Sequence, residues 1–128
     1  MRRLGSTRYF ARQLKQLKKQ YRHVEQDIEP LKSDLESGAT PGDRLQGLND
    51  ALVYKVRIPN RDAGRGKSGG YRIIYYVQTA ENVYLLLIYS KSEQEDVPTA
   101  LILGALAEAD SNEENESDET SDEDKSDA

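Results

Sequence analysis

Basic side chains are concentrated in one stretch of the sequence, from position 55 to position 72. The stretch holds six Lys or Arg and one acid, Asp62. Clustered ammonium and guanidinium groups bind anions, and guanidinium groups in particular match the geometry of phosphate oxygens. The sequence therefore predicts an anion-binding surface built from Lys55, Arg57, Arg61, Arg65, Lys67 and Arg72.

Other chemistries are disfavoured by what the sequence lacks. It has one histidine, His23, and no cysteine, which excludes a paired-histidine mechanism and thiolate catalysis. No acid or histidine cluster with metal-ligand spacing lies within residues 39–91, so we expect no metal or other cofactor. Residues 66–68, GKS, end like a phosphate-binding loop, but that loop needs glycine where this chain has Arg61. No serine has a base partner, which disfavours acyl transfer.

Three β-type runs are predicted to carry the basic residues. They cover residues 52–58, 71–79 and 83–90 and are rich in Val, Ile, Tyr and Leu. Residues 80–82 are short enough to join the last two runs as a hairpin, whereas residues 59–70 form a long cationic loop. Because side chains alternate along a strand, one face of the first run can pack while the other presents charge.

An N-terminal helical region is predicted to cover the sheet. Thr7 or Ser6 can cap a helix that begins near Arg8. Apolar residues then recur at alternating steps of four and three, which is the spacing of one helix face. The stripe consists of Phe10, Leu14, Leu17, Tyr21, Val24, Ile28, Leu31 and Leu35.

This stripe could form one long coiled-coil helix or a helical hairpin. Proline costs about 3 kcal/mol in a helix interior, and a small sheet needs a hairpin to cover it. We therefore predict a break between residues 19 and 27, with Asp27 capping a second helix and Pro30 in its first turn. That helix should end near Ser37 and Gly38.

The C-terminal part divides into a short helix and an acidic tail. A helix should start at Pro98 or Thr99 and run through Ala107. Residues 110–128 hold ten acids and one lysine, a net charge of −9, so the whole-chain charge of −5 leaves +4 on residues 1–109. We predict a folded, basic domain over residues 1–109 and a disordered tail over residues 110–128.

The absence of cysteine is compatible with a reducing cytoplasm. No signal peptide is recognisable at Met1, and no apolar run is long enough to span a bilayer. We expect a cytoplasmic protein with no membrane partner.

Three segments resemble a known family: YKVRI at 54–58, GRGKSGGYRIIYYV at 64–77 and LLLIYSKSEQED at 85–96. They resemble the RelE/HigB group of toxin–antitoxin mRNA-cleaving toxins, especially its HigB-like branch. The resemblance covers about residues 6–108. It implies an α+β fold in which an N-terminal helical hairpin covers a small antiparallel sheet of three to four strands. Members usually have a strand before the first helix, which only residues 1–5 could supply here, and these read poorly as a strand.

The resemblance also implies an endoribonuclease in which the 2′-hydroxyl of RNA attacks the adjacent phosphate. By position, it assigns Lys55 or Arg57 to the 2′-hydroxyl and Arg72 to the transition state. It assigns Lys91, with Tyr89 as its neighbour, to the leaving group. The remaining basic residues would bind backbone phosphates: Arg61, Arg65 and Lys67.

Plainer interpretations of these residues stay open. Lys55 and Arg57 could be solvated strand residues, and Lys91 could protect a strand end. The implied partners are mRNA in the ribosomal A site and a helix-turn-helix antitoxin, with operator DNA bound only through the antitoxin. Two other functions are left open: a ParE-like inhibitor of DNA gyrase without enzymatic activity, and a degenerate toxin that only binds its antitoxin.

Overall fold

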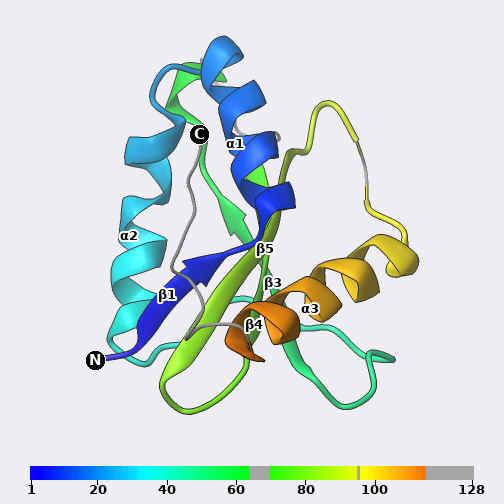
Figure 1. The fold of residues 1–128 in the computed structure, drawn as a ribbon. Coiled ribbons are helices and arrows are strands. Elements are labelled where there is room, and N and C mark those ends of the chain that lie inside the picture. Colours follow the sequence, from blue (N-terminus) through cyan, green and yellow to red (C-terminus); the bar gives the residue numbers. More distant parts are fainter. Residues whose placement is uncertain (64–69, 95, 115–128) are drawn as a thin grey trace, which may run out of the picture.

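A computed structural model describes residues 1–63, 70–94 and 96–114. In this part of the chain, three helices pack against a five-stranded sheet (Figure 1). A 3-10 turn at Arg61–Ala63 follows the third strand. The elements in chain order are β1 (Arg3–Ser6), α1 (Arg8–Gln20), α2 (Val24–Glu36), β2 (Asp43–Arg44), β3 (Leu52–Ile58), β4 (Tyr71–Val77), β5 (Asn82–Ser90) and α3 (Thr99–Glu114).

The strands are arranged in the order β1-β5-β4-β3-β2. β3, β4 and β5 are antiparallel neighbours, and β1 runs parallel to β5 at one edge. The α+β fold and the three β-type runs are confirmed, although β4 ends at Val77 and β5 begins at Asn82. The expected three to four strands were too few, because β1 and the two-residue β2 complete the sheet.

The first strand forms although its residues read poorly as a strand. Its pairing is non-local, with Arg3 opposite Asn82 and Ser6 opposite Leu85. The amide of Thr7 then donates to the carbonyl of Leu85 at 3.1 Å. A partner strand that is already ordered can hold a short segment with weak intrinsic preference.

The helical hairpin is confirmed, but the predicted start of its second helix was wrong. Thr7 caps α1, since its hydroxyl accepts the amide of Phe10 at 3.0 Å. α2 begins at Val24, and Pro30 therefore lies inside the helix. The earlier start lets Val24 and Ile28 become fully buried, which offsets the cost of the proline. Instead of capping the helix, the side chain of Asp27 accepts a hydrogen bond from Nε of Arg61.

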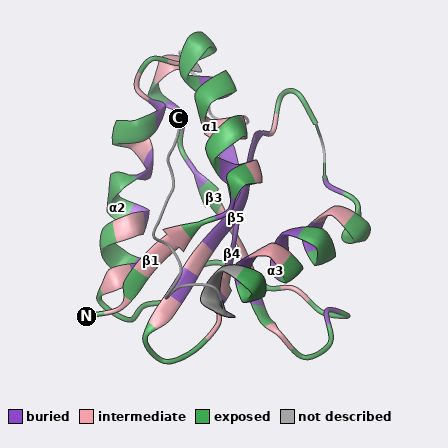
Figure 2. Ribbon diagram, in the orientation of Figure 1, coloured by how far each residue is buried: buried purple, intermediate pink, exposed green. Residues whose placement is uncertain are grey.

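Each face of the sheet has its own apolar cluster (Figure 2). α1 and α2 cover one face, where Phe10 and Ile28 belong to the same buried cluster as Ile73 and Tyr75. α3 covers part of the other, where Ile102 and Leu106 pack in the same cluster as Ile74 and Leu86. The two groups of helices therefore lie on opposite sides of one sheet (Figure 1).

α3 extends past residue 109, the predicted end of the domain, to Glu114. Asp110 is part of the folded structure, because its carboxylate accepts the Tyr76 hydroxyl at 3.0 Å and the Gln78 amide at 2.9 Å. The rest of the predicted tail, residues 115–128, lies outside the described residues. None of the helices in the described ranges has the length and apolar character to cross a membrane.

Candidate functional site

Three of the predicted site residues form one row across the sheet. Arg57 on β3 lies directly opposite Arg72 on β4, and Arg72 lies directly opposite Tyr89 on β5. Directly paired residues on neighbouring strands project from the same face. Tyr89 belongs to the cluster on the α3 side, so the whole row faces that side. The sheet therefore brings together residues that are up to 32 positions apart in sequence.

A bulge in β5 sets this row. Leu85 pairs with Tyr75 and Leu87 with Ile74, so Leu86 has no partner in the β4–β5 ladder. Both Leu86 and Leu87 face the α3 side. If Leu86 were instead paired with Ile74 in a regular ladder, Arg72 would face Ile88, and Tyr89 would turn to the α1 and α2 side. A bulge that redirects a side chain in this way is common next to functional sites.

Burial differs along the row. Arg57 is exposed, whereas Arg72 and Tyr89 are only 8% and 3% exposed. The Tyr89 hydroxyl is buried and has no hydrogen-bond partner in the described part of the chain. Burial, reinforced by the carboxylate of Asp96, raises the pKa of Tyr89, while Arg72 lowers it. Tyr89 is therefore a neutral phenol at neutral pH, with a proton to donate.

Lys55 lies on the same face, two residues before Arg57 on β3. Its ammonium group is 3.5 Å from Oδ1 of Asp96, in the segment between β5 and α3. The Lys55 side chain is 31% exposed and that of Asp96 is 67% exposed. The pair thus forms at the open edge of the site, where a phosphate of a bound strand could reach it. Sequence reasoning missed Asp96, because its only signal is a place in the acidic SEQED segment.

Lys91 is held at the end of β5 by its backbone. Its amide donates to the carbonyl of Gly70 at 3.0 Å, just before β4 begins. Gly70 has φ +85°, and a Cβ there would lie 2.5 Å from the carbonyl oxygen of Ile58. Only glycine fits this position, where β3, β4 and Lys91 meet. Lys91 itself is half-buried and directly follows Ser90, the last residue of β5.

The predicted phosphate-binding residues are only partly described. Arg61 is bonded through Nε to Oδ1 of Asp27 at 2.8 Å, which joins the start of the cationic loop to α2. Next to it, Asp62 accepts a hydrogen bond from the backbone amide of His23 at 2.6 Å and contacts His23 Nδ1 at 2.7 Å. These hydrogen bonds to His23 lower the pKa of the Asp62 carboxyl. Arg65 and Lys67 lie outside the described residues.

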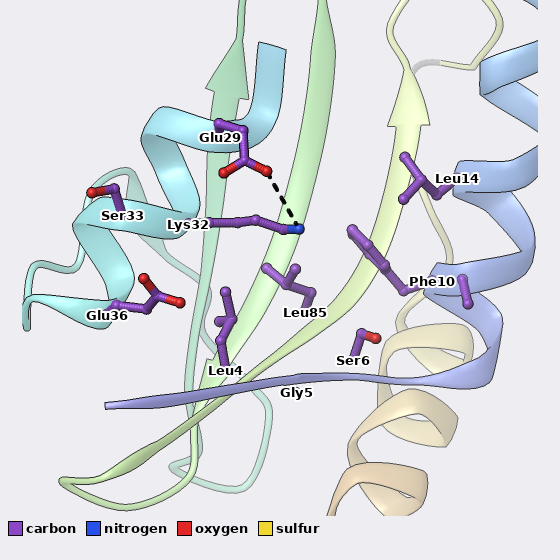
Figure 3. A pocket seen from close by; sticks show the side chains of 11 residues that line it. Leu4, Gly5, Ser6, Phe10, Leu14, Glu29, Lys32, Ser33, Glu36 and Leu85 are labelled. Carbon is purple, nitrogen blue, oxygen red and sulfur yellow. Dashed lines mark ion pairs between the residues drawn. The ribbon is translucent and has the colours of Figure 1, made fainter. Parts of the chain in front are cut away.

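The opposite side of the sheet offers a different kind of concavity. A groove of about 490 Å³ opens between β1, α1 and α2 (Figure 3). Its floor is apolar, with Leu4, Phe10 and Leu85 pointing into it, and its rim carries Glu29 paired with Lys32 at 3.8 Å. This groove holds none of the predicted site residues. Among the described side chains, no group of three or more His, Asp and Glu could hold a metal ion.

The site therefore combines two arginines in register, a lysine with a carboxylate partner and a buried phenol. Such a set can bind a phosphodiester, stabilise negative charge on its oxygens and move protons. A comparison with known families agrees with the sequence motifs. The family model described as the RelE toxin of the RelE/RelB toxin–antitoxin system matches residues 3–119.

Proposed function

The chain belongs to the RelE family of toxins from toxin–antitoxin systems, and on this premise we propose that it is an endoribonuclease that cleaves mRNA on the ribosome. The observation that carries the proposal is the row of Arg57, Arg72 and Tyr89, with Lys55 beside it on the same face. Neighbouring strands lie about 4.8 Å apart, so consecutive side chains of the row can contact one phosphate and its neighbours.

The reaction needs little covalent help from the protein. The 2′-hydroxyl of a nucleotide attacks its own 3′-phosphate, which forms a 2′,3′-cyclic phosphate and releases a 5′-hydroxyl. The protein must align the strand, remove one proton, stabilise charge on the phosphoryl oxygens and return a proton to the leaving oxygen. The cationic row supplies charge stabilisation without a metal ion.

Arg72 is the best candidate for stabilising the transition state. It sits in the middle of the row and is largely buried, so water screens its charge weakly. Arg57 is exposed at the edge of the row and would bind the scissile phosphate or the next one. Lys91 and the Tyr89 phenol are the groups that could protonate the leaving oxygen.

The partners follow from the same proposal. A toxin of this family has an antitoxin partner. For this chain we propose a helix-turn-helix antitoxin that binds operator DNA and holds the toxin inactive. The resemblance of the segments at 64–77 and 85–96 supports a place in the HigB-like branch. The substrate would then be mRNA in the ribosomal A site of the cytoplasm.

Induction of the wild-type protein in cells, followed by primer extension on a reporter mRNA, tests the proposal. We expect growth arrest with discrete mRNA cleavages, and loss of both in Arg72→Ala. Arg12→Ala is the matched control, because it removes an exposed arginine from α1. Growth arrest with intact mRNA and a DNA-damage response would instead identify a gyrase inhibitor. No arrest would indicate a degenerate toxin.

A further inference from the structure

The proposed reaction needs a group that accepts the proton of the 2′-hydroxyl, and the row itself does not provide one. Arginine does not deprotonate in proteins. The Tyr89 phenol keeps its proton, since burial raises its pKa. Lys55 was assigned this role from the sequence, but its ammonium group is paired with Asp96. In this pair Nζ of Lys55 donates a hydrogen bond to the carboxylate, so Lys55 serves as the donor and Asp96 as the acceptor.

Asp96 is a carboxylate at the same place. Oδ1 accepts the amide of its neighbour Val97 at 2.9 Å, which fixes the orientation of the side chain. Its backbone carbonyl accepts the side-chain amide of Gln94 at 2.9 Å, which orders the segment around it. The side chain is two-thirds exposed, so a bound RNA strand can reach it. Asp96 is thus an oriented, accessible carboxylate beside Lys55, and it is close enough to Tyr89 to interact with it electrostatically.

We propose that Asp96 is the general base of this site and that Lys55 is the cation that holds and balances it. This inference rests on the proposed endoribonuclease function. The Asp96 carboxylate takes the proton of the 2′-hydroxyl while the 2′-oxygen bonds to phosphorus. The bond from phosphorus to the 5′-oxygen breaks, and the 5′-oxygen takes a proton from Lys91. Proton exchange with water then returns both side chains to their starting states.

The charged groups around Asp96 come from several elements. Lys55 is on β3 and pairs with Asp96. Tyr89 on β5 is close enough to interact electrostatically with Asp96 and with Arg72 on β4. Lys91 and Glu93 lie on the segment that carries Asp96. Asp43 on β2 is directly opposite Lys55 in the sheet and is the competing carboxylate.

The test is a single-turnover cleavage assay with the full-length protein and ribosomes carrying a labelled mRNA. Removing a general base costs a factor of about 100 to 10,000. We expect the loss of rate in Asp96→Asn to fall in this range. Asp96→Glu, which keeps a carboxylate, should recover part of the rate. Glu25→Gln is the matched control, because it breaks an exposed Lys–Glu pair on the side of the sheet that α1 and α2 cover.

Three outcomes separate the possibilities. If Asp96→Asn causes no further loss of rate in the Lys55→Gln background, Asp96 only positions Lys55 and the proposal is wrong. If Asp96→Asn cleaves at the wild-type rate, or Asp43→Asn is the variant that loses the rate, the proposal is also wrong. In both cases cleavage by the wild type would still support the endoribonuclease. Failure of the wild type to cleave mRNA would overturn both proposals. Circular dichroism spectra of all variants confirm that each is folded.

Discussion

The two faces of β4 serve different purposes. Tyr71, Ile73 and Tyr75 point to α1 and α2 and are fully buried among apolar side chains. On the other face, Ile74 and Tyr76 pack near α3, but Arg72 lies in a row with another arginine. One face is wholly a hydrophobic core, whereas the other is a core at one end and a charged site at the other. Because side chains alternate along β4, a substitution on the core face should change mainly stability, whereas a substitution of Arg72 on the other face should change mainly the proposed activity.

The largest expected effect on stability comes from the core face. Ile73→Ala should lower the free energy of unfolding by about 2 to 5 kcal/mol, because it removes buried methylene groups and leaves a cavity. Urea denaturation monitored by circular dichroism measures this loss. Cleavage by the folded variant should persist at low temperature. A variant that is as stable as the wild type, or folded but inactive, would break the proposed separation of the two faces.

Arg57→Gln should show the opposite pattern. Arg57 lies directly opposite Arg72, and like charges in this arrangement destabilise a sheet by a few tenths of a kcal/mol to about 1 kcal/mol. The variant should therefore be slightly more stable than the wild type, and the gain should shrink in high salt. Its cleavage rate should fall about 10- to 100-fold, the equivalent of a lost hydrogen bond to a charged group.

Melting temperatures at low and high salt, together with single-turnover rates, measure both effects of Arg57→Gln. A loss of stability at low salt would mean that Arg57 has a structural partner. Arg57 would then contribute to stability, as the residues of the core face do.

A smaller effect is expected at the other end of the α3 face. Asp110→Ala removes the acceptor of hydrogen bonds from Tyr76 and Gln78, which attach the later turns of α3 to β4. The expected loss is about 0.5 to 1.5 kcal/mol for each hydrogen bond. The comparison of Asp110→Ala, Tyr76→Phe and the double variant isolates the bond between Asp110 and Tyr76. Additive losses would show that this bond does not contribute to stability.

The smallest effect concerns the link between the cationic loop and the helical hairpin. The hydrogen bonds with His23 hold the pKa of Asp62 below its ordinary 3.8 in the folded protein. A depressed carboxyl pKa stabilises the fold above pH 3.8, and this contribution is lost as the pH falls through the folded pKa. The difference in melting temperature between the wild type and Asp62→Asn should be present at pH 6 and shrink below pH 4. A difference that does not change with pH would rule out the ionised Asp62 carboxylate as its cause.

Local features of the fold could be predicted from the sequence, and long-range ones could not. The Thr7 cap and the limits of β3 depend on adjacent residues, so the sequence contains their signal. β1 forms by pairing with β5, and the start of α2 depends on the burial of Val24, so neither has a local signature.

The site divides in the same way. Strand alternation predicted that Lys55 and Arg57 share a face, and the motif resemblance added Arg72, Tyr89 and Lys91. The structure was needed to locate the bulge at Leu86 and the ion pair with Asp96, because both depend on contacts between distant parts of the chain.

The most direct test of this account compares cleavage and stability in Arg72→Ala. The purified wild type and the variant are incubated with ribosomes carrying a labelled mRNA, and their thermal unfolding is followed in parallel. We expect the wild type to produce discrete fragments ending in a 2′,3′-cyclic phosphate. The variant should be about 100- to 1,000-fold slower, as when a group that stabilises transition-state charge is removed, and should still unfold in one cooperative transition. Cleavage by folded Arg72→Ala at the wild-type rate would contradict the assignment of this row as the active site.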